Sequence, residues 1–196
     1  MSKLETNTID TVSGTTTLQI GSTNTNTITL GTSGDTITVP SGASLSVPSG
    51  GLSGQNYPAF QAYQGSSQTI SNTTNTKAEI DTEEFDTDNC YNTSTYRFTP
   101  TVAGKYFVYA QLSLYGASDV DLARTQIYKN GSLFVRGDVD PVNSYPQNRN
   151  TVKVSYTIDM NGSTDYVEVF GLLTTSATRT IENGLNSHFG AYRIGA

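Results

Sequence analysis

Residues 104–115 read Gly-Lys-Tyr-Phe-Val-Tyr-Ala-Gln-Leu-Ser-Leu-Tyr, and both alternating sides of this stretch are apolar or aromatic. Successive side chains of a strand point to opposite faces. One face suits a protein core: Tyr106, Val108, Ala110, Leu112 and Leu114. The outward face carries three aromatic residues: Phe107, Tyr109 and Tyr115. Because a half-buried antiparallel strand normally keeps one polar face, this pattern favours burial against a neighbouring subunit. A covering loop of the same chain is the alternative.

Further strand patterns follow toward the C-terminus. Residues 151–158 alternate cleanly, and four side chains are predicted to point inward: Val152, Val154, Tyr156 and Ile158. Residues 125–129 lead through Asn130-Gly131 into residues 133–135, and Asn161-Gly162 precedes another strand at 166–173. Both Asn-Gly pairs favour hairpin turns. No stretch shows helical periodicity, so the sequence predicts an all-β antiparallel sandwich.

The chain divides into two regions of different composition. All 12 Tyr and all 7 Phe lie between Tyr57 and Tyr192, whereas the first 50 residues contain no aromatic residue. A boundary is therefore predicted near Gly50-Gly51. It separates residues 1–51, an attachment segment and stalk, from residues 52–196, a head domain.

The N-terminal region is internally repetitive. Paired apolar residues recur between turn-forming residues such as Pro40-Ser41-Gly42: Leu18/Ile20, Ile28/Leu30, Ile37/Val39 and Leu45/Val47. Two apolar side chains per unit bury too little area to offset chain ordering at roughly 1–2 kcal/mol per residue. We therefore expect a β-repeat stalk whose apolar face is shared between identical chains. A disordered Thr/Ser linker is the alternative.

The charge balance excludes some partners. The chain has 17 acidic and 11 basic residues, a net charge of −6, and its basic residues are scattered. Binding of nucleic acid requires a clustered positive field, so nucleic acid is not an expected partner. No signal peptide is readable, and no apolar run approaches the ~20 residues that cross a bilayer. We expect synthesis in a cytoplasm without membrane insertion.

Short segments along the second region carry a resemblance to a known family: Pro58-Ala59-Phe60-Gln61-Ala62-Tyr63, Phe85-Asp86, Tyr96-Arg97-Phe98-Thr99-Pro100, Ala103-Gly104-Lys105-Tyr106-Phe107-Val108, Ile127-Tyr128-Lys129-Asn130-Gly131, Asp165-Tyr166-Val167-Glu168-Val169 and His188-Phe189-Gly190-Ala191-Tyr192. In order and spacing they resemble the globular head of complement component one, subcomponent q, which is related to the tumour necrosis factor family. The resemblance implies a ten-stranded, two-sheet jelly roll that packs as a homotrimer with its N-termini at one end. We expect the trimer interface at eleven residues: Leu18, Ile20, Ile28, Leu30, Ile37, Val39, Phe60, Phe107, Tyr109, Tyr115 and Tyr192.

The stalk suggests where such a trimer works. A Thr-rich, Gly-punctuated repeat before such a head is similar to bacteriophage fibre and virion-surface proteins, and residues 1–11 resemble the starts of marine phage structural proteins. This resemblance implies a virion tail fibre or spike. Its N-terminal segment would contact other virion proteins, and its head would contact a host polysaccharide or protein. A capsid decoration protein or head fibre is the alternative, and a surface-glycan depolymerase is a third possibility.

Signals for catalysis are absent from the sequence. His188 is the only histidine, and we interpret it as a hydrogen-bonded structural residue. Cys90 is the only cysteine, so no intrachain disulfide forms, and no neighbour in the sequence lowers its pKa. No phosphate loop, GxSxG elbow or HExxH motif is present. We expect neither an enzyme nor a cofactor.

Two polar segments are candidate binding sites. The spacing of Glu79, Asp81 and Glu83 fits a solvated strand face, so no metal is predicted there, with calcium as the alternative. The long turn-rich loop at 137–150 offers an aromatic ring among hydrogen-bonding groups: Asp138, Asp140, Asn143, Tyr145, Gln147 and Arg149. These residues are predicted to bind a surface ligand. An ordinary solvated loop is the alternative.

Overall fold

The computed structural model of the chain describes residues 36–43, 57–117, 120–139 and 148–195. The chain divides into two units, Met1–Gly51 and Leu52–Ala196. In the first unit, the backbone N–H of Ala43 donates to the carbonyl of Pro40 at 3.0 Å, which closes the expected turn. Ile37 and Val39 are 66% and 44% exposed in the single chain, and the segment 36–43 contains no strand. The other predicted stalk pairs lie outside the described residues.

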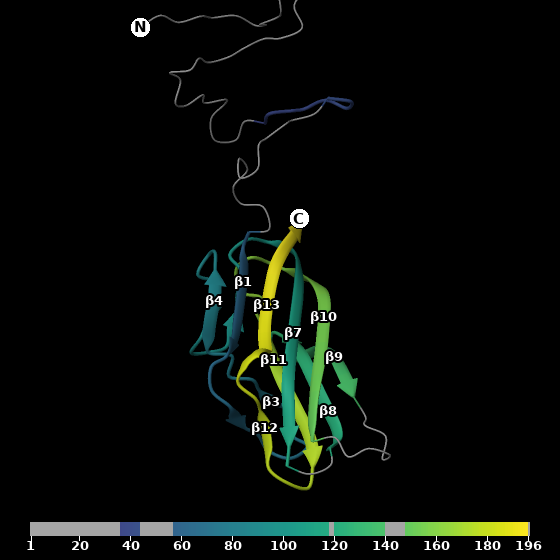
Figure 1. The fold of residues 1–196 in the computed structure, drawn as a ribbon. Helices are drawn as coiled ribbons and strands as arrows, with labels where there is room; N and C mark the ends of the chain where they lie inside the picture. Colours follow the sequence, from purple (N-terminus) through teal and green to yellow (C-terminus); the bar gives the residue numbers. More distant parts are fainter. Residues whose placement is uncertain (1–35, 44–56, 118–119, 140–147, 196) are drawn as a thin grey trace, which may run out of the picture. The chain divides into compact units, whose positions relative to one another are not determined.

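The second unit, hereafter the head, is all-β and contains no helix among its described residues, so none there spans a membrane. Its strands form two antiparallel sheets (Figure 1). Thirteen strands are described: β1 (Ala59–Gln64), β2 (Gln68–Thr69), β3 (Thr76–Lys77), β4 (Thr82–Asp86), β5 (Tyr91–Asn92), β6 (Arg97–Phe98), β7 (Gly104–Gly116), β8 (Val120–Lys129), β9 (Ser132–Val139), β10 (Arg149–Met160), β11 (Val167–Thr175), β12 (Arg179–Ile181) and β13 (Gly184–Gly195).

The first sheet is built around β7. Strand β10 pairs along the full length of β7. Strands β13 and β12 pair with successive parts of β7, so they share its other edge. Beyond β13 follow β1 and then β4. This arrangement brings the first and last long strands of the head together in one sheet, because Ala59 of β1 lies opposite Tyr192 of β13.

The second sheet has the order β5-β6-β11-β8-β9, with β3 also pairing with β11. The predicted hairpin at Asn130-Gly131 is confirmed: both residues have positive φ, 52° and 76°, and they join β8 to β9. The hairpin predicted at Asn161-Gly162 is wrong, because β10 belongs to the first sheet and β11 to the second. There, Oδ1 of Asn161 instead accepts backbone hydrogen bonds from residues 163–165 and shapes a crossing loop.

The core lies between the two sheets. The inward set predicted for β7 is confirmed, since its five members are at most 3% exposed: Tyr106, Val108, Ala110, Leu112 and Leu114. Tyr156 was predicted to be inward as well, but it is 53% exposed. Its ring packs edge-on against Phe134 of β9 at 5.7 Å. Tyr156 lies on the inward side of β10, but the ring packed against it belongs to Phe134, which is itself 46% exposed, so solvent reaches both side chains.

The strand register defines two ends of the head. At the entry end, β1 begins beside the last residues of β13, and β7 begins opposite Met160. At the opposite end, hereafter the distal end, β7 finishes and β10 begins, since Tyr115 lies opposite Arg149. Strand β9 also finishes on the distal side, since Val139 lies opposite Ala123 near the start of β8.

Candidate subunit interface

The outward face of the β7 sheet carries the aromatic side chains expected there. Phe107 and Tyr109 are half-buried, while their neighbours Tyr106 and Val108 are fully buried. The predicted outward direction of both residues is therefore confirmed. No loop of the described chain covers them completely.

The strand register arranges this face in rows that run across three strands. Each row takes one residue from β13, one from β7 and one from β10: Tyr192–Phe107–Thr157, Gly190–Tyr109–Ser155 and His188–Gln111–Lys153. The first row is mainly aromatic. The second has small residues on both sides of Tyr109, and the third is polar and charged.

Phe107 and Tyr192 form the centre of the aromatic row. Their ring centroids are 5.6 Å apart with an interplanar angle of 46°, and Tyr109 lies 6.1 Å from Phe107. Tyr192 remains 36% exposed. Aromatic residues are enriched in protein interfaces because they combine a large apolar area with a polar group at the tip. This cluster gives the face the chemistry of a contact surface.

Tyr109 lies flat across β13 instead of standing away from the sheet. A Cβ atom at Gly190 would overlap its phenol ring, so the ring rests on the glycine backbone. The hydroxyl donates a 2.6 Å hydrogen bond to Oε1 of Gln61 on β1. Burial raises the pKa of the Tyr109 phenol, so the hydroxyl keeps its proton. The side-chain amide of Gln61 donates in turn to Glu84.

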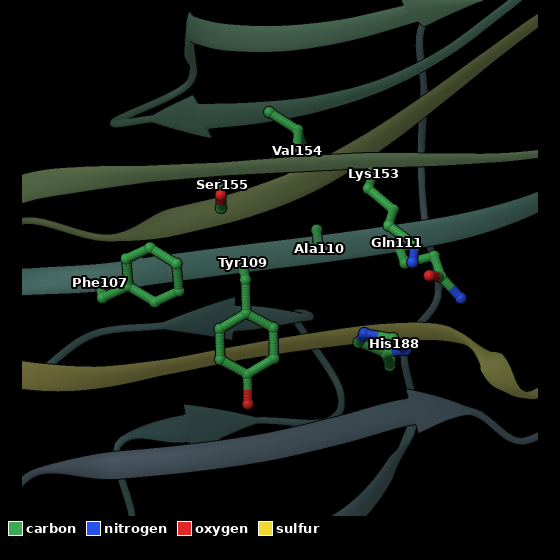
Figure 2. A pocket seen from close by; sticks show the side chains of 8 residues that line it. All are labelled: Phe107, Tyr109, Ala110, Gln111, Lys153, Val154, Ser155 and His188. Carbon is green, nitrogen blue, oxygen red and sulfur yellow. The ribbon is translucent and has the colours of Figure 1, made fainter.

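The orientation of Tyr109 leaves a hollow over β7 and β10. Figure 2 shows the ring of Tyr109 directed away from Ser155, while Lys153 extends toward Gln111. The hollow has a volume of about 350 Å³. It is lined by side chains and backbone of three strands: Phe107, Tyr109, Ala110, Gln111, Lys153, Val154, Ser155 and His188.

The ring of His188 is hydrogen-bonded to the backbone, as expected of a structural histidine. Its Nδ1 lies 2.7 Å from the carbonyl oxygen of Leu185. Since a carbonyl only accepts hydrogen bonds, Nδ1 carries the proton and donates it. The ring also meets Tyr109 edge-on at 6.1 Å.

The structure contradicts one predicted interface residue, Phe60, and places another, Tyr115, at the distal end of the head. Phe60 is fully buried inside the head, stacked on Tyr91 at 4.5 Å and on Phe98 at 4.6 Å. Its assignment to the trimer interface is wrong, because its position in β1 points it between the sheets. Tyr115 lies at the distal end, where the guanidinium of Arg149 is 5.6 Å from its ring.

Two of the predicted ligand-binding residues have partners within the chain. Asp138 forms ion pairs with Arg124 at 3.0 Å and Arg136 at 3.1 Å. Arg149 makes a bidentate pair with Glu182, in which both hydrogen bonds measure 2.6 Å. The structure places Asp138 in β9 and Arg149 at the start of β10. The remaining four predicted residues, Asp140, Asn143, Tyr145 and Gln147, lie outside the described residues.

The acidic segment before and within β4 does not gather into a cluster. Glu79, Asp81 and Glu83 are exposed. The Asp81 carboxylate accepts a 2.6 Å hydrogen bond from the backbone N–H of Gly65. In the described part of the chain, no group of three or more His, Cys, Asp or Glu side chains is placed to hold a metal ion.

Sequence reasoning missed Gln61, Gly190 and Lys153 on the outward face. A signal was present for Gly190, because a glycine inside a strand pattern indicates close approach of another group. No local signal identified Gln61 or Lys153. Their place on the face follows from the pairing of strands that are distant in the sequence.

The sequence matches no protein-family model and no curated protein. Solved structures, in contrast, are similar to the head. The globular domain of zebrafish complement 1qA protein has a TM-score of 0.52 at 12% identity, covering 70% of this chain and 96% of that domain. Murine APRIL has a TM-score of 0.53 at 9% identity, covering 70% and 98%. The Eiger TNF from S. frugiperda is similar at a TM-score of 0.49.

The head is therefore a two-sheet jelly roll of the type seen in complement globular domains, as the sequence predicted. The structure has thirteen described strands where the resemblance implied ten, and four of them are only two residues long: β2, β3, β5 and β6. At sequence identities of 9–12%, structural similarity to these proteins establishes the fold alone.

Proposed function

We propose that the protein is a homotrimeric virion structural protein, a bacteriophage tail fibre or spike, in which three heads associate through the outward face of the β7 sheet. The observation that carries this proposal is the aromatic cluster of Phe107, Tyr109 and Tyr192 on that face. The fold supports it, because the resemblance to complement heads implies a trimer. The proposed function involves no making or breaking of covalent bonds.

The energetics favour association of this face. Apolar area removed from water contributes roughly 25 cal/mol per Å², so an aromatic row left half-exposed on one chain is stabilised when a second chain covers it. Tyr109 is already fixed by Gln61 and Gly190. A side chain that is ordered before binding loses little entropy on binding.

The positions of the strand ends in the head support a role in which the head projects from the virion. The first strand of the head, β1, begins at the entry end beside the last residues of β13. Strand β9 finishes and β10 begins at the opposite, distal end of the head. We propose that residues 1–11 dock on other virion proteins and that the distal loops meet a host polysaccharide or protein. Three copies of a weak site gain avidity from their linkage.

Solution mass tests the assembly. The full chain, measured by light scattering at micromolar concentration, is expected at three times its 21.0 kDa chain mass. Replacing both Phe107 and Tyr192 by serine is expected to lower that mass toward one chain while the β-sheet circular dichroism persists. A wild-type protein that stays at 21.0 kDa overturns the trimer.

Location on the particle tests the virion role. Gold labelling of a tagged chain on intact particles is expected at the tail. Labelling over the capsid would instead support a decoration protein, and the absence of label from particles would refute both.

A glycan-cleavage assay tests the depolymerase alternative. Incubation of the protein with surface glycan is expected to release no reducing ends. Release that is abolished by one carboxylate substitution would establish a depolymerase.

A further inference from the structure

A second hollow of the head lies at one edge of the second sheet, where β5 and β6 form a short hairpin. Arg97 lies opposite Asn92 in this hairpin, next to the buried pair Tyr91 and Phe98. Since successive side chains of a strand alternate, Asn92 and Arg97 point out of the sandwich. The hollow has a volume of about 400 Å³. Sites that hold small molecules measure roughly 300–1,000 Å³.

The side chains around this hollow, hereafter the hairpin pocket, are suited to hydrogen bonding. Its polar lining consists of Asn89, Asn92, Thr95, Arg97 and Thr99, and no acidic residue of the described chain contributes to it. The side chains of Asn89 and Thr99 have no hydrogen-bond partner among the described residues. Because amide and hydroxyl groups both donate and accept hydrogen bonds, they match the hydroxyl groups of a sugar ring.

Arg97 is held in a fixed orientation beside these groups. Its Nε donates a 2.8 Å hydrogen bond to the carboxylate of Glu168, which is only 2% exposed. The guanidinium also lies over the ring of Tyr166, 4.1 Å from the ring centroid. Neither contact occupies the two terminal NH2 groups, which have no partner in the described part of the chain. Such a fork binds a carboxylate through two parallel hydrogen bonds, and its prior ordering reduces the entropy lost on binding.

The surrounding charges favour an anionic ligand. Glu168 also forms an ion pair with Lys77, so one buried carboxylate serves two cations and leaves one excess positive charge. Asp86 is engaged elsewhere, because it accepts hydrogen bonds from the backbone N–H of Tyr91 at 2.7 Å and from the Cys90 thiol. A pocket with an excess cation and no acidic lining attracts a negatively charged group.

The hairpin pocket stays open in the proposed trimer. It lies on the outward side of the second sheet, since Asn92 and Arg97 point away from the core. The proposed association uses the outward side of the other sheet, at Phe107, Tyr109 and Tyr192. The two surfaces are on opposite sides of the core, so a ligand can reach the pocket on every subunit.

We infer that the hairpin pocket binds an acidic sugar unit, with the sugar carboxylate on the terminal NH2 groups of Arg97 and the sugar hydroxyls on the neighbouring asparagine and threonine side chains. This inference rests on the proposed function for the source of the sugar, a host polysaccharide that contains carboxylated units. It adds a contact site apart from the distal loops. A neutral sugar would leave the charge of Arg97 unused, and a simple anion would leave the amides and hydroxyls unused.

Ligand-observed nuclear magnetic resonance of the full chain tests the site with three probes. Saturation is expected to transfer from the protein to glucuronate at millimolar concentration. Glucose, which lacks the carboxylate, and acetate, which lacks the ring and its hydroxyls, are each expected to bind at least about tenfold more weakly, because charge-assisted hydrogen bonds and hydroxyl contacts both contribute.

Asn92→Asp is the most informative variant, because it places a carboxylate opposite Arg97. Oδ1 of Asn92 accepts hydrogen bonds from the backbone N–H groups of residues 94 and 95, and an aspartate keeps both, so the hairpin turn is retained. The affinity for glucuronate is expected to fall at least about tenfold, since like charges repel and the new carboxylate competes for Arg97.

Two further variants complete the comparison. Arg97→Gln removes the cation and is expected to abolish the preference for glucuronate over glucose. Asn183→Asp makes the same charge change as Asn92→Asp at an exposed position between β12 and β13, where the oxygen that accepts from Ser67 is kept. This control is expected to bind glucuronate as wild type does. Far-ultraviolet circular dichroism confirms that each variant is folded.

The outcomes separate the inference from the proposed function. Absence of saturation transfer to glucuronate from the folded wild-type chain overturns the site, and so does unchanged affinity in Asn92→Asp. Glucose that binds as tightly as glucuronate overturns the acidic class, and acetate that binds as tightly overturns the sugar. A trimeric chain that binds no glucuronate retains the proposed assembly and loses the site. A monomeric chain that binds it refutes the trimer and retains the site.

Discussion

The ring of Tyr109 lies directly on the backbone of Gly190, at a position where any β-carbon would overlap the phenol. The two residues are opposite each other in the register of β7 and β13. This contact lets the Tyr109 hydroxyl reach Gln61 on the next strand. The absence of a side chain at Gly190 thus allows the Tyr109 ring to lie across β13.

Replacing Gly190 by alanine tests that relationship. The new methyl group displaces the Tyr109 ring, which breaks the hydrogen bond to Gln61 and costs about 1 kcal/mol in the free energy of unfolding. Urea unfolding at one fixed chain concentration measures the loss. Gly195→Ala is the matched control, because nothing lies within 4 Å of a Cβ at that position. Equal stability of the two variants would contradict the contact.

Phe60 is expected to be important for the fold and not for assembly. Truncation to alanine removes a fully buried ring from the stack with Tyr91 and Phe98, which costs about 3–5 kcal/mol. Phe85→Ala is the comparison for stability, since Phe85 is 47% exposed, and it is expected to lower the unfolding midpoint only slightly. A Phe60→Ala variant as stable as Phe85→Ala would contradict the buried position.

The distal ion pair is expected to make stability depend on pH. Hydrogen bonds from Arg149 lower the pKa of the Glu182 carboxyl below its usual 4.5. A depressed carboxyl pKa stabilises the folded state above the unfolded pKa, and this contribution is lost as the pH falls through the folded pKa. Glu182→Gln is therefore expected to reduce the melting temperature at pH 7, and the melting temperatures of the two proteins are expected to converge as the pH falls below 4.5 through the lowered pKa of Glu182. If the difference in melting temperature between wild type and Glu182→Gln stayed constant from pH 7 into acidic pH, the link between stability and ionisation of Glu182 would be refuted.

Cys90 is expected to be unreactive in the folded head. Burial and a hydrogen bond from its thiol to Asp86 both raise the pKa of Cys90, so little thiolate forms at pH 8. Reaction with a disulfide reagent should be slow in buffer and fast in 8 M urea. Glu79→Cys supplies an exposed thiol as a positive control. Fast labelling of native Cys90 would contradict its buried environment.

Local patterns predicted much of the head. The alternation of residues 104–115 identified the core face and the outward aromatic face of β7 correctly. The Asn130-Gly131 pair identified its hairpin, because a tight turn with two positive φ angles needs those residue types. Asn161-Gly162 carries the same signal, yet it leads from one sheet to the other, since a turn residue does not specify the partner of the strand that follows.

Burial at the margins of the sandwich was harder to predict. Tyr156 and Val154 occupy equivalent positions in the alternation of β10, but Val154 is 8% exposed and Tyr156 is 53% exposed. The difference lies in what the second sheet places over each side chain. Phe60 was assigned to the surface for the same reason, since its sequence context does not reveal the rings stacked on it.

The sequence by itself determined the long strands, the inward side of β7 and the aromatic character of its outward side, because these properties depend on residue type and a period of two. Only the tertiary structure decided that Phe107 meets Tyr192, that Tyr109 rests on Gly190, and that Lys153 and Glu84 occupy opposite sides of one face. Those relationships depend on which distant strands pair and in which register. Pairing is settled by burial of the whole core, and no short segment contains that information.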